Sequence, residues 1–597
     1  LEEVFSRNRF PTIKDSPYVF TLGFHDYYWF LIRKKEEIVI AEKRQIIPEL
    51  EVSGSWEAVF KGKTKEKLEG EILPLYIEDC RWFGGKTRNI QQIEVIENIT
   101  VGEDHSVTQL LFLEVRYTEG LPDVYLLPLS FSSGNEAEKI SKENPQAVVT
   151  LIKNQGIIYD GVYNEEFQKN LFQMISGRHT VKGLEGQLTA YHGELFKNFK
   201  GKELTLEKSQ VLKAEQSNTS ILYGKELFFK LYRRLDEGIN PDLEITRFLT
   251  EETSFPNIPP FVGAIEYRRN GILSASEGSG SQPIIIGILQ RFTPNQGDAW
   301  TYTLDSVRGY FERVLSRRKE IGEVPKTPSS LLEIAYEEIP PLFRELIGGI
   351  YIEMANLLGK RTAELHLALS SSTEDPNFAP EPFSVLYQRS VYQSMESLTK
   401  RVFELLGINL KNLKDTQKQA ATEILGFQKE IMEQFKALFK KKISAMKIRI
   451  HGDYHLGQVL YTGNDFVIID FEGEPARAVS ERRLKRSPIR DVAGMIRSFH
   501  YSVYNSLFKH VPLTPEELLK LEPWTDLWYK YVAGLFLRSY LDTAKDAPFI
   551  PRNREELNIM LRAHLLEKAI YELGYELNYR PDWVIIPIKG IKDLLKA

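Results

Sequence analysis

Three side chains that can do chemistry follow one another at short intervals between His451 and Glu474. Asp453 lies in a polar turn, Gln458 follows five residues later, and Asp470 ends an apolar run. A carboxylate base beside an amide and a second carboxylate is a layout that holds Mg²⁺ and a hydroxyl group against a nucleoside triphosphate. These residues predict phosphoryl transfer.

A hairpin is the element that must position them. The apolar runs 459–461 and 466–469 are partly β-branched and enclose a polar turn at 462–465, which predicts two paired strands. In protein kinases the catalytic-loop Asp and Asn are also five residues apart and are followed by Asp-Phe-Gly. Here Asp470-Phe471-Glu472 occupies that later position. Because Glu472 replaces the glycine, the pattern favours a fixed small-molecule site over a mobile activation segment.

A lysine upstream supplies the phosphate side of the predicted site. Lys230 lies inside an apolar strand, and a buried lysine needs an acidic partner or a ligand anion. Glu244 follows on a predicted helix, so we expect a Lys230–Glu244 pair that directs the lysine to the phosphates. The alternative is a solvated lysine at a strand edge.

The turn at 215–220, between two predicted strands, can cover phosphates with its hydroxyl and N–H groups. Its candidates are Ser217, Asn218 and Thr219. Many ordinary hairpins have equally polar turns, so this signal is weak alone.

A change of character near residue 292 predicts two lobes. Strands are expected at 261–267 and 284–290, and the breaker cluster 293–298 ends the β-rich part. We expect a cleft at this hinge, where a purine can bond to the backbone near Gln290 and Phe292. Helices are then expected at about 299–321, 330–370, 383–406, 414–443, 515–545 and 553–578.

The last of these helices carries candidate sugar ligands. Lys568, Tyr571, Glu572 and Tyr575 are spaced three and four apart, so they share one face. Aromatic rings and acids on one face suit the C–H surfaces and hydroxyls of a sugar. An amphipathic helix that packs its tyrosines on the core has the same pattern.

Composition excludes several other classes of protein. The 597 residues carry a net charge of −5 without a long basic run, which argues against a nucleic-acid partner. No apolar run is long enough to span a membrane. The single cysteine, Cys80, excludes an internal disulfide framework and fits a reducing, cytoplasmic compartment. The chain begins at Leu1 without an initiator Met, so we expect a piece of a longer protein.

The remaining patterns complete the expected architecture. Apolar runs at 18–22 and 27–32 predict a hairpin, and residues 71–160 predict a small antiparallel sheet preceded by one helix. We expect an α+β, bilobal fold like that of eukaryotic protein kinases, with an N-terminal cap subdomain, a β-rich N-lobe and a mostly helical C-lobe. The expected boundaries are 1–50 (hairpin and linker), 51–176 (cap), 177–292 (N-lobe) and 293–597 (C-lobe).

Several of these motifs together resemble the maltokinases. The resemblance covers roughly residues 70–597 and is most specific over 451–475. Residues 1–35 resemble the last β-hairpin of trehalose synthase, so the resemblance implies the kinase half of a trehalose synthase–maltokinase fusion. The matching segments are His451–Gln458, Asp470–Pro475, Arg490–Met495, Arg497–Phe499, Arg361–His366, Tyr387–Ser390, Arg580–Trp583 and Arg81–Phe83.

The resemblance implies a maltokinase activity. Such an enzyme transfers phosphate from ATP, with Mg²⁺, to the anomeric hydroxyl of maltose, and the maltose 1-phosphate feeds α-glucan (glycogen) synthesis from trehalose. The alternative is a kinase for another small substrate, such as glucosamine or an aminoglycoside. Trehalose synthase, fused or associated, is the implied protein partner.

The resemblance also implies roles for the candidate residues. Asp453 orients or deprotonates the sugar hydroxyl, Gln458 and Asp470 hold Mg²⁺, and Lys230 with Glu244 meets the phosphates. The candidate sugar ligands are His451, Glu472, Lys568, Tyr571, Glu572 and Tyr575.

Overall fold

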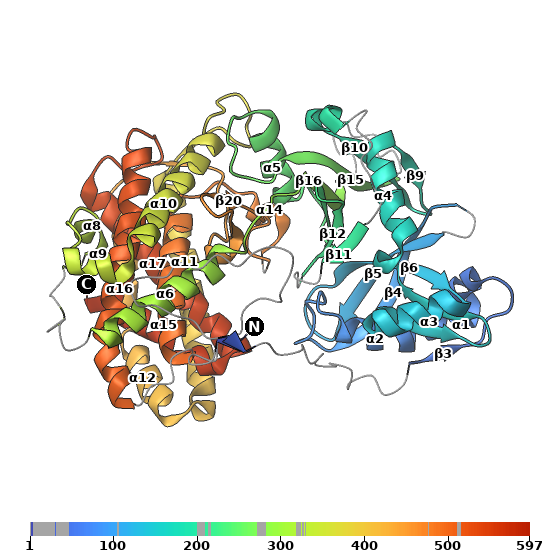
Figure 1. Cartoon of the computed structure of the whole chain (residues 1–597), viewed down its shortest axis with the longest axis horizontal. Coiled ribbons are helices and arrows are strands. Elements are labelled where there is room, and N and C mark those ends of the chain that lie inside the picture. Colours follow the sequence, from blue (N-terminus) through green and yellow to red (C-terminus); the bar gives the residue numbers. More distant parts are fainter. Residues whose placement is uncertain are drawn as a thin grey trace.

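The structure is a computed structural model with three parts, the cap, the N-lobe and the C-lobe (Figure 1). The cap is drawn in blue, the N-lobe in teal to green, and the helical C-lobe in yellow-green to red. The residues that the structure describes are 2–3, 30–31, 47–103, 107–199, 209–212, 217–270, 282–317, 324, 328, 330–475, 477–509 and 515–596.

The expected N-terminal hairpin at 18–32 lies almost entirely outside the described residues. What the structure describes there is one short pairing, in which β1 (Glu2–Glu3) runs antiparallel to β2 (Phe30–Leu31).

The cap is built on one sheet with strand order β3-β7-β8-β6-β5-β4. Successive side chains of β5 point to opposite faces, and both faces are covered. Leu111 and Leu113 pack into the cap core with helix α2, whereas Leu110 and Phe112 pack against the N-lobe. This double burial explains why β5 is almost continuously apolar. The elements of the cap are β3 (Glu49–Leu50), α1 (Gly62–Lys67), α2 (Leu73–Asp79), β4 (Ile90–Val101), β5 (Thr108–Tyr117), β6 (Asp123–Ser132), α3 (Gly134–Glu143), β7 (Val148–Ile152) and β8 (Gly156–Asp160).

The N-lobe is a second sheet, with strand order β11-β12-β13-β16-β15-β10-β9. In β13, Phe229 and Leu231 are fully buried in the N-lobe core. Lys230 lies between them and therefore points to the other face of the sheet. The strands and helices are α4 (Glu165–Gly177), β9 (Thr180–Lys182), β10 (Gly186–His192), β11 (Ser209–Leu212), β12 (Thr219–Tyr223), β13 (Leu227–Leu231), β14 (Arg234–Leu235), α5 (Pro241–Glu251), β15 (Phe261–Arg269) and β16 (Ile284–Arg291).

The boundary between the cap and the N-lobe differs from the expected one at residue 176. Helix α4 ends at Gly177, and its buried residues Phe167, Leu171 and Ile175 pack in the N-lobe cluster. Packing therefore assigns α4 to the N-lobe.

The cap and the N-lobe are also joined directly. Strand β14 pairs with β6 of the cap sheet. The adjacent Arg233, 1% exposed, donates to Asp160 of the cap at 2.7 Å and to the Thr219 hydroxyl of β12 at 2.7 Å.

The C-lobe is a helical bundle with a small hairpin, β19 (Val459–Tyr461) and β20 (Phe466–Ile468), as the sequence predicts. Two further strands, β17 (Glu381–Pro382) and β18 (Met446–Lys447), form a separate pair. The helices are α6 (Ala299–Ser316), α8 (Leu331–Ile334), α9 (Pro341–Ile347), α10 (Gly349–Leu369), α11 (Val385–Asn409), α12 (Asp415–Gly426), α13 (Gln428–Lys440), α14 (Val479–Arg482), α15 (Ile489–Lys509), α16 (Pro515–Ala544), α17 (Arg554–Tyr579) and α18 (Ile585–Lys596).

Two of the long helices expected from periodicity are interrupted. The segment 330–370 forms three helices, because Pro340-Pro341 and Gly348-Gly349 break the backbone pattern. The segment 414–443 breaks after Gly426 into α12 and α13. Among the helices of the described part, none combines the length and the apolar character needed to cross a membrane.

Candidate active site

A buried aspartate, Asp491, holds the loop that carries Asp453 through hydrogen bonds to its backbone. Asp491, on the first turn of α15, accepts the N–H groups of His451 and Gly452 at 2.8 and 3.0 Å. His366 of α10 lies 3.1 Å from the same carboxylate and also contacts the Tyr540 hydroxyl. Since these groups are buried, the bonds fix the backbone on which Asp453 stands.

Asp453 is kept ionised by its surroundings. Its carboxylate accepts from the Lys568 ammonium at 3.1 Å, and His455 lies 3.9 Å away. Burial alone would raise the pKa of Asp453, but Lys568, and after it His455, outweigh burial and lower this pKa to about 2. The carboxylate is thus available at neutral pH to accept a hydrogen bond from a hydroxyl group.

Gln458 and Asp470 lie side by side, as predicted. The Gln458 amide nitrogen donates to Asp470 Oδ2 at 2.8 Å. Asp470 has a left-handed backbone (φ 67°), a conformation that residues other than glycine rarely adopt. An amide oxygen and a carboxylate are hard oxygen ligands of the kind that Mg²⁺ prefers. Asp242, Asp470 and Glu472 also offer oxygens within 4.8 Å of one another. The residues therefore fit the metal that a kinase requires.

The expected pairing of Lys230 with Glu244 is wrong. Lys230 instead contacts Asp242 at 3.0 Å, Asp470 at 2.6 Å and Glu472 at 2.6 Å. Burial would lower the pKa of Lys230, but these three carboxylates raise it well above its usual value. Lys230 is therefore a fixed cation beside Asp470, the candidate metal ligand.

Helix geometry explains why Asp242 replaces Glu244. Two residues apart on a helix are about 200° apart around its axis, so only one of them can face β13. Asp242 also accepts from the Tyr232 hydroxyl and from the N–H of Phe471. Glu244 faces the C-lobe and pairs with Arg449 at 2.8 Å and Arg483 at 2.6 Å.

Glu472 lies on the phosphate side of the site. It contacts Lys230, and its carboxylate accepts from the Asn218 amide at 2.7 Å. Burial raises the pKa of Glu472 to about 7, against the opposing effect of Lys230, and the neighbouring Asp470 adds to the rise. The structure thus places Glu472 with the nucleotide candidates, and its contact with a sugar stays a prediction.

The candidates of the phosphate-covering turn divide into two groups. Asn218 reaches across the cleft to Glu472, and Ser217 beside it is exposed. Thr219 belongs to β12, and its hydroxyl oxygen accepts from the buried Arg233, which leaves the O–H group free to donate. The phosphate roles of Ser217, Asn218 and Thr219 stay predictions. Residues 213–216 of this turn are outside the described residues.

The hinge lies where the sequence predicts it, but two of its backbone N–H groups already donate hydrogen bonds within the protein. The N–H of Phe292 donates to Glu226 O at 2.7 Å, and that of Arg291 donates to Pro260 O at 2.9 Å. Gln290 is buried within β16 between β13 and β15. A purine at this edge would have to use groups other than the Phe292 N–H.

Helix α17 brings one candidate sugar ligand, Lys568, directly to the Asp453 carboxylate. Lys568 contacts Asp453 and lies 4.8 Å from the ring of Tyr571. Tyr575 is 44% exposed and lies against Tyr579 and Arg580. This face of α17 therefore extends from the reacting position toward solvent.

Two other candidate sugar ligands, Glu572 and His451, already have partners within the protein. Glu572 binds the guanidinium of Arg497, which is 1% exposed, at 2.7 Å. His451 is buried, and its Nε2 contacts Ile469 O at 2.9 Å, joining the Asp453 loop to the Asp470 loop. Their contacts with a sugar stay predictions.

Three residues that position the site received no role from the sequence. Asp242 and Asp491 are buried acids, and Arg490 is a nearly buried base that binds Glu474. Arg490 and Asp491 stood only within the matching segment Arg490–Met495. A signal existed for Asp242, since it stands two residues before Glu244 on the same predicted helix.

The fold and the site define the class of the protein. The two lobes, with the buried Lys230 bound to the helix acid Asp242 and with Asp453 and Asp470 on neighbouring loops, make an α+β, bilobal kinase fold with an N-terminal cap, as expected. Residues 76–163 match the family described as "Maltokinase N-terminal cap domain". These residues include most of the cap sheet, and the resemblance to maltokinases is confirmed by this match.

Similar proteins of known sequence are glucosamine kinases. The chain is 22% identical over 383 residues to the glucosamine kinase of Streptacidiphilus jiangxiensis, covering 64% of this chain and 72% of that protein. It is 29% identical over 146 residues to the glucosamine kinase of Mycolicibacterium smegmatis, covering 24% of this chain and only 34% of that relative.

Solved structures show the same fold. A glucosamine kinase in complex with glucosamine, ADP and inorganic phosphate superposes with a TM-score of 0.54 at 16% identity, covering 91% of this chain and all (100%) of the other. A second crystal of a glucosamine kinase gives a TM-score of 0.52 at 16% identity over 84% of this chain and 92% of that one. The chain is thus a kinase-type phosphotransferase with a maltokinase-type cap.

Proposed function

We propose that the protein transfers the γ-phosphoryl group of ATP to the anomeric hydroxyl of maltose and releases maltose 1-phosphate and ADP. The observation that carries the proposal is the Asp453–Lys568 contact, which joins the catalytic loop to the sugar-binding helix. The cap match at residues 76–163 supports maltose as the sugar. Trehalose synthase as partner and the supply of α-glucan synthesis belong to the same proposal.

Asp453 acts mainly by orienting the hydroxyl group. A carboxylate with a pKa of about 2 is a weak base. In a loose phosphoryl-transfer transition state the nucleophile keeps its proton until late, so a weak base in the right place suffices. Asp453 accepts the hydrogen bond of the anomeric hydroxyl, holds its oxygen in line with the γ-phosphorus, and takes the proton as the new O–P bond forms.

Lys230 stabilises negative charge on the transferred group. Its ammonium is fixed by Asp242, and it lies beside Asp470, where a metal-bound phosphate would approach. Mg²⁺, when bound by Gln458 and Asp470, neutralises phosphate charge and orients the triphosphate. Glu472 and Asn218 close the same side of the cleft.

Charges around the acceptor site favour a neutral sugar over an amino sugar. Glu474 is neutralised by Arg477 and Arg490, and Glu572 by Arg497. Asp453 is paired with Lys568. The ammonium group of glucosamine would therefore meet carboxylates that already have cationic partners, and it would be repelled by Lys568.

Glucosamine remains the second candidate acceptor, because two curated relatives are named glucosamine kinase. Initial rates of ADP release with maltose, glucosamine, glucose and an aminoglycoside separate the candidates. We expect kcat/KM to be highest for maltose. A kcat/KM for glucosamine above that for maltose would overturn the proposal and favour the second candidate.

A further inference from the structure

Helix α17 carries a row of tyrosines that continues outward from the candidate acceptor site. Tyr575 and Tyr579 follow Lys568 by seven and eleven residues. At about 100° per residue, both lie within about 20° of Lys568 around the helix axis. Tyr571, whose ring centroid is 4.8 Å from the Lys568 ammonium, stands between Lys568 and Tyr575 along the axis. The row therefore starts at the lysine that contacts Asp453 and ends at the last residue of the helix.

The outer end of this row is an exposed aromatic surface. Tyr575 and Tyr579 are 44% and 58% exposed, and their ring centroids are 4.8 Å apart. The guanidinium of Arg580 lies 5.3 Å from the centroid of the Tyr575 ring and 4.7 Å from that of the Trp583 ring. Single exposed apolar side chains are ordinary, whereas adjacent ones mark a binding surface.

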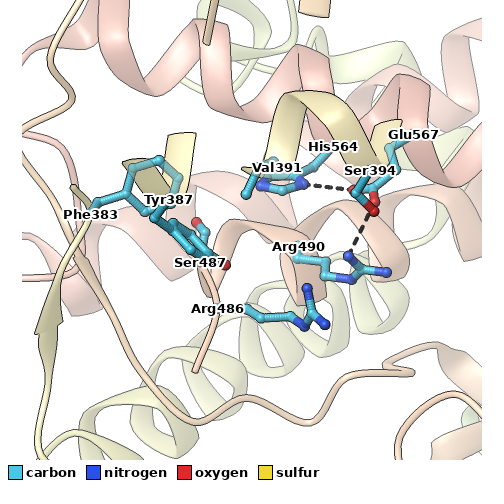
Figure 2. Close-up of a pocket in the computed structure, with 9 residues that line it drawn as sticks. All are labelled: Phe383, Tyr387, Val391, Ser394, Arg486, Ser487, Arg490, His564 and Glu567. Carbon is cyan, nitrogen blue, oxygen red and sulfur yellow. Dashed lines mark hydrogen bonds and ion pairs between the residues drawn. The ribbon is translucent and has the colours of Figure 1, made fainter. Parts of the chain in front are cut away.

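Buried ion pairs hold the helix that carries the row. Figure 2 shows Glu567 of α17 with His564 and Arg490, which it contacts at 3.0 and 3.1 Å. At the outer end the buried Glu576 contacts Arg580 at 2.9 Å, so the guanidinium between the rings is fixed as well. A ligand that stacks on groups already held in place loses less conformational freedom, and this surface is therefore preorganised.

The row is longer than a disaccharide needs. Because each helical residue adds about 1.5 Å, the axial distance from Lys568 to Tyr579 is about 16 Å. In the proposed function the reducing ring lies at Asp453, and maltose supplies only one further ring. Maltose therefore ends before Tyr579 and Trp583, whereas a longer chain of the same sugar continues onto them.

We propose that the acceptor site extends along α17 and takes linear α-1,4-glucans of about three or four glucose units as well as maltose, an inference that rests on the proposed function. The reducing end lies at Asp453, and the outer rings stack on Tyr579 and its aromatic neighbours. Aromatic faces suit the C–H surfaces of pyranose rings.

The chemical step is the same for every chain length. The anomeric oxygen forms a bond to the γ-phosphorus, and the bond from the γ-phosphorus to the β–γ bridging oxygen breaks. The hydroxyl proton passes to Asp453. The products are ADP and the 1-phosphate of the oligosaccharide.

Contacts far from the reacting hydroxyl leave a recognisable kinetic signature. They are equally strong in the ground state and in the transition state, so they lower KM and leave kcat unchanged. We therefore expect kcat/KM for maltotetraose to exceed that for maltose by about threefold or more, through KM alone.

The test measures initial rates of ADP release with maltose, maltotriose and maltotetraose. Tyr579→Ala should abolish the gain for maltotetraose and keep kcat/KM for maltose within about twofold. Tyr579→Phe keeps the ring and should keep the gain. Tyr336→Ala, which removes a 52%-exposed tyrosine between α8 and α9, is the matched control and should also keep it.

The possible failures of the two proposals are distinguishable. Phosphorylation of maltose with equal kcat/KM for all three sugars would overturn the extended site and leave maltose as the acceptor. A gain for maltotetraose that survives in Tyr579→Ala would overturn it too. The absence of ADP release with any of the three sugars would contradict the proposed function, and the extended site with it.

Discussion

At the scale of single residues, the low pKa of Asp453 determines what this carboxylate contributes. Lys568 is the largest of the groups that oppose the effect of burial on this pKa. The same lysine lies on the helix that carries the sugar candidates. In the proposed mechanism, Lys568 therefore sets the protonation state of Asp453 and lies where the acceptor sugar binds.

Replacement of Lys568 by Met should raise the pKa of Asp453 from about 2 toward its ordinary value near 3.8. Turnover needs the ionised carboxylate, so activity is lost as the pH falls through that pKa. The acid limb of kcat should therefore move to higher pH in the variant. Lys592→Met, which removes a lysine on α18 paired with Glu423, is the control and should leave the limb in place. An unmoved acid limb in Lys568→Met would contradict the electrostatic role.

Asp242 and Glu244 give a second test at this scale, because sequence and structure disagree on which acid serves Lys230. Asp242→Asn weakens a charge-assisted contact of a buried lysine, so we expect kcat/KM for ATP to fall about 10-fold or more. Glu244→Gln should keep KM for ATP within about twofold and lower the free energy of unfolding by about 1–3 kcal/mol. Steady-state kinetics and urea unfolding of both variants check this. The reverse pattern would restore the sequence-based pairing.

The residues that sequence reasoning located share a local signal. Asp453, Gln458 and Asp470 stand at fixed intervals around one hairpin, and Lys230 interrupts an apolar strand. The acid that pairs with Lys230 has no such local signal, because the orientation of helix α5 decides which of its side chains reaches the lysine. Asp242 and Glu244 are both acids on the same first turn, and only the packing of α5 on β13 decides between them.

At the scale of elements, α15 and α10 hold the catalytic loop in place. Asp491 and His366 are both buried and bonded to each other, and Asp491 also accepts two backbone N–H groups. Gly452, between His451 and Asp453, has a φ of 88°, a conformation that glycine adopts without strain.

Asp491→Asn keeps the shape of this side chain but places an amide N–H₂ where a carboxylate oxygen accepts. We expect the loop to shift and kcat to fall about 100-fold, because small misplacements of a reacting group are that costly. Binding of ATP should change little, since Lys230 and Asp470 are not bonded to Asp491. Single-turnover rates and calorimetric ATP titration separate the two effects. A kcat within a few-fold of the wild-type value would refute this role of α15.

Element positions were more predictable than element ends. The strand predictions at 211–232, 261–267 and 284–290 match β11–β13, β15 and β16, because alternation and β-branched residues mark them. The prediction of one long helix over 330–370 was wrong, because two proline and two glycine residues interrupt the periodicity. Strands β7 to β10 were not predicted individually, although β7 and β8 lie in the segment 71–160, for which the sequence predicts a small antiparallel sheet.

At the scale of the whole molecule, buried ion pairs join the parts. Arg233 connects the cap to the N-lobe through Asp160. Glu244 connects the N-lobe to the C-lobe through Arg449 and Arg483. Such contacts between residues far apart in sequence could not be read from one chain, because nothing local in it specifies which buried charges meet.

Asp160→Asn would leave the 1%-exposed Arg233 without its anionic partner. Breaking a buried pair in this way destabilises a protein by about 3–5 kcal/mol, so we expect lower stability and earlier proteolysis at the cap junction. Glu51→Gln removes an exposed pair with Lys153 in the same domain and should leave stability unchanged. Urea unfolding and limited proteolysis measure the effect. Equal stability of the two variants would show that the Arg233 pair does not hold the junction.

The most direct test of the central claim is to follow maltose and ATP together. A 1-phosphate blocks the reducing end, so each ADP released should be matched by one reducing end lost, and ³¹P NMR should show a phosphate ester coupled to the anomeric proton. Asp453→Asn should reduce both signals by about 100-fold or more while ATP still binds. ADP release with reducing ends preserved, or turnover of Asp453→Asn close to that of the wild-type protein, would contradict the account.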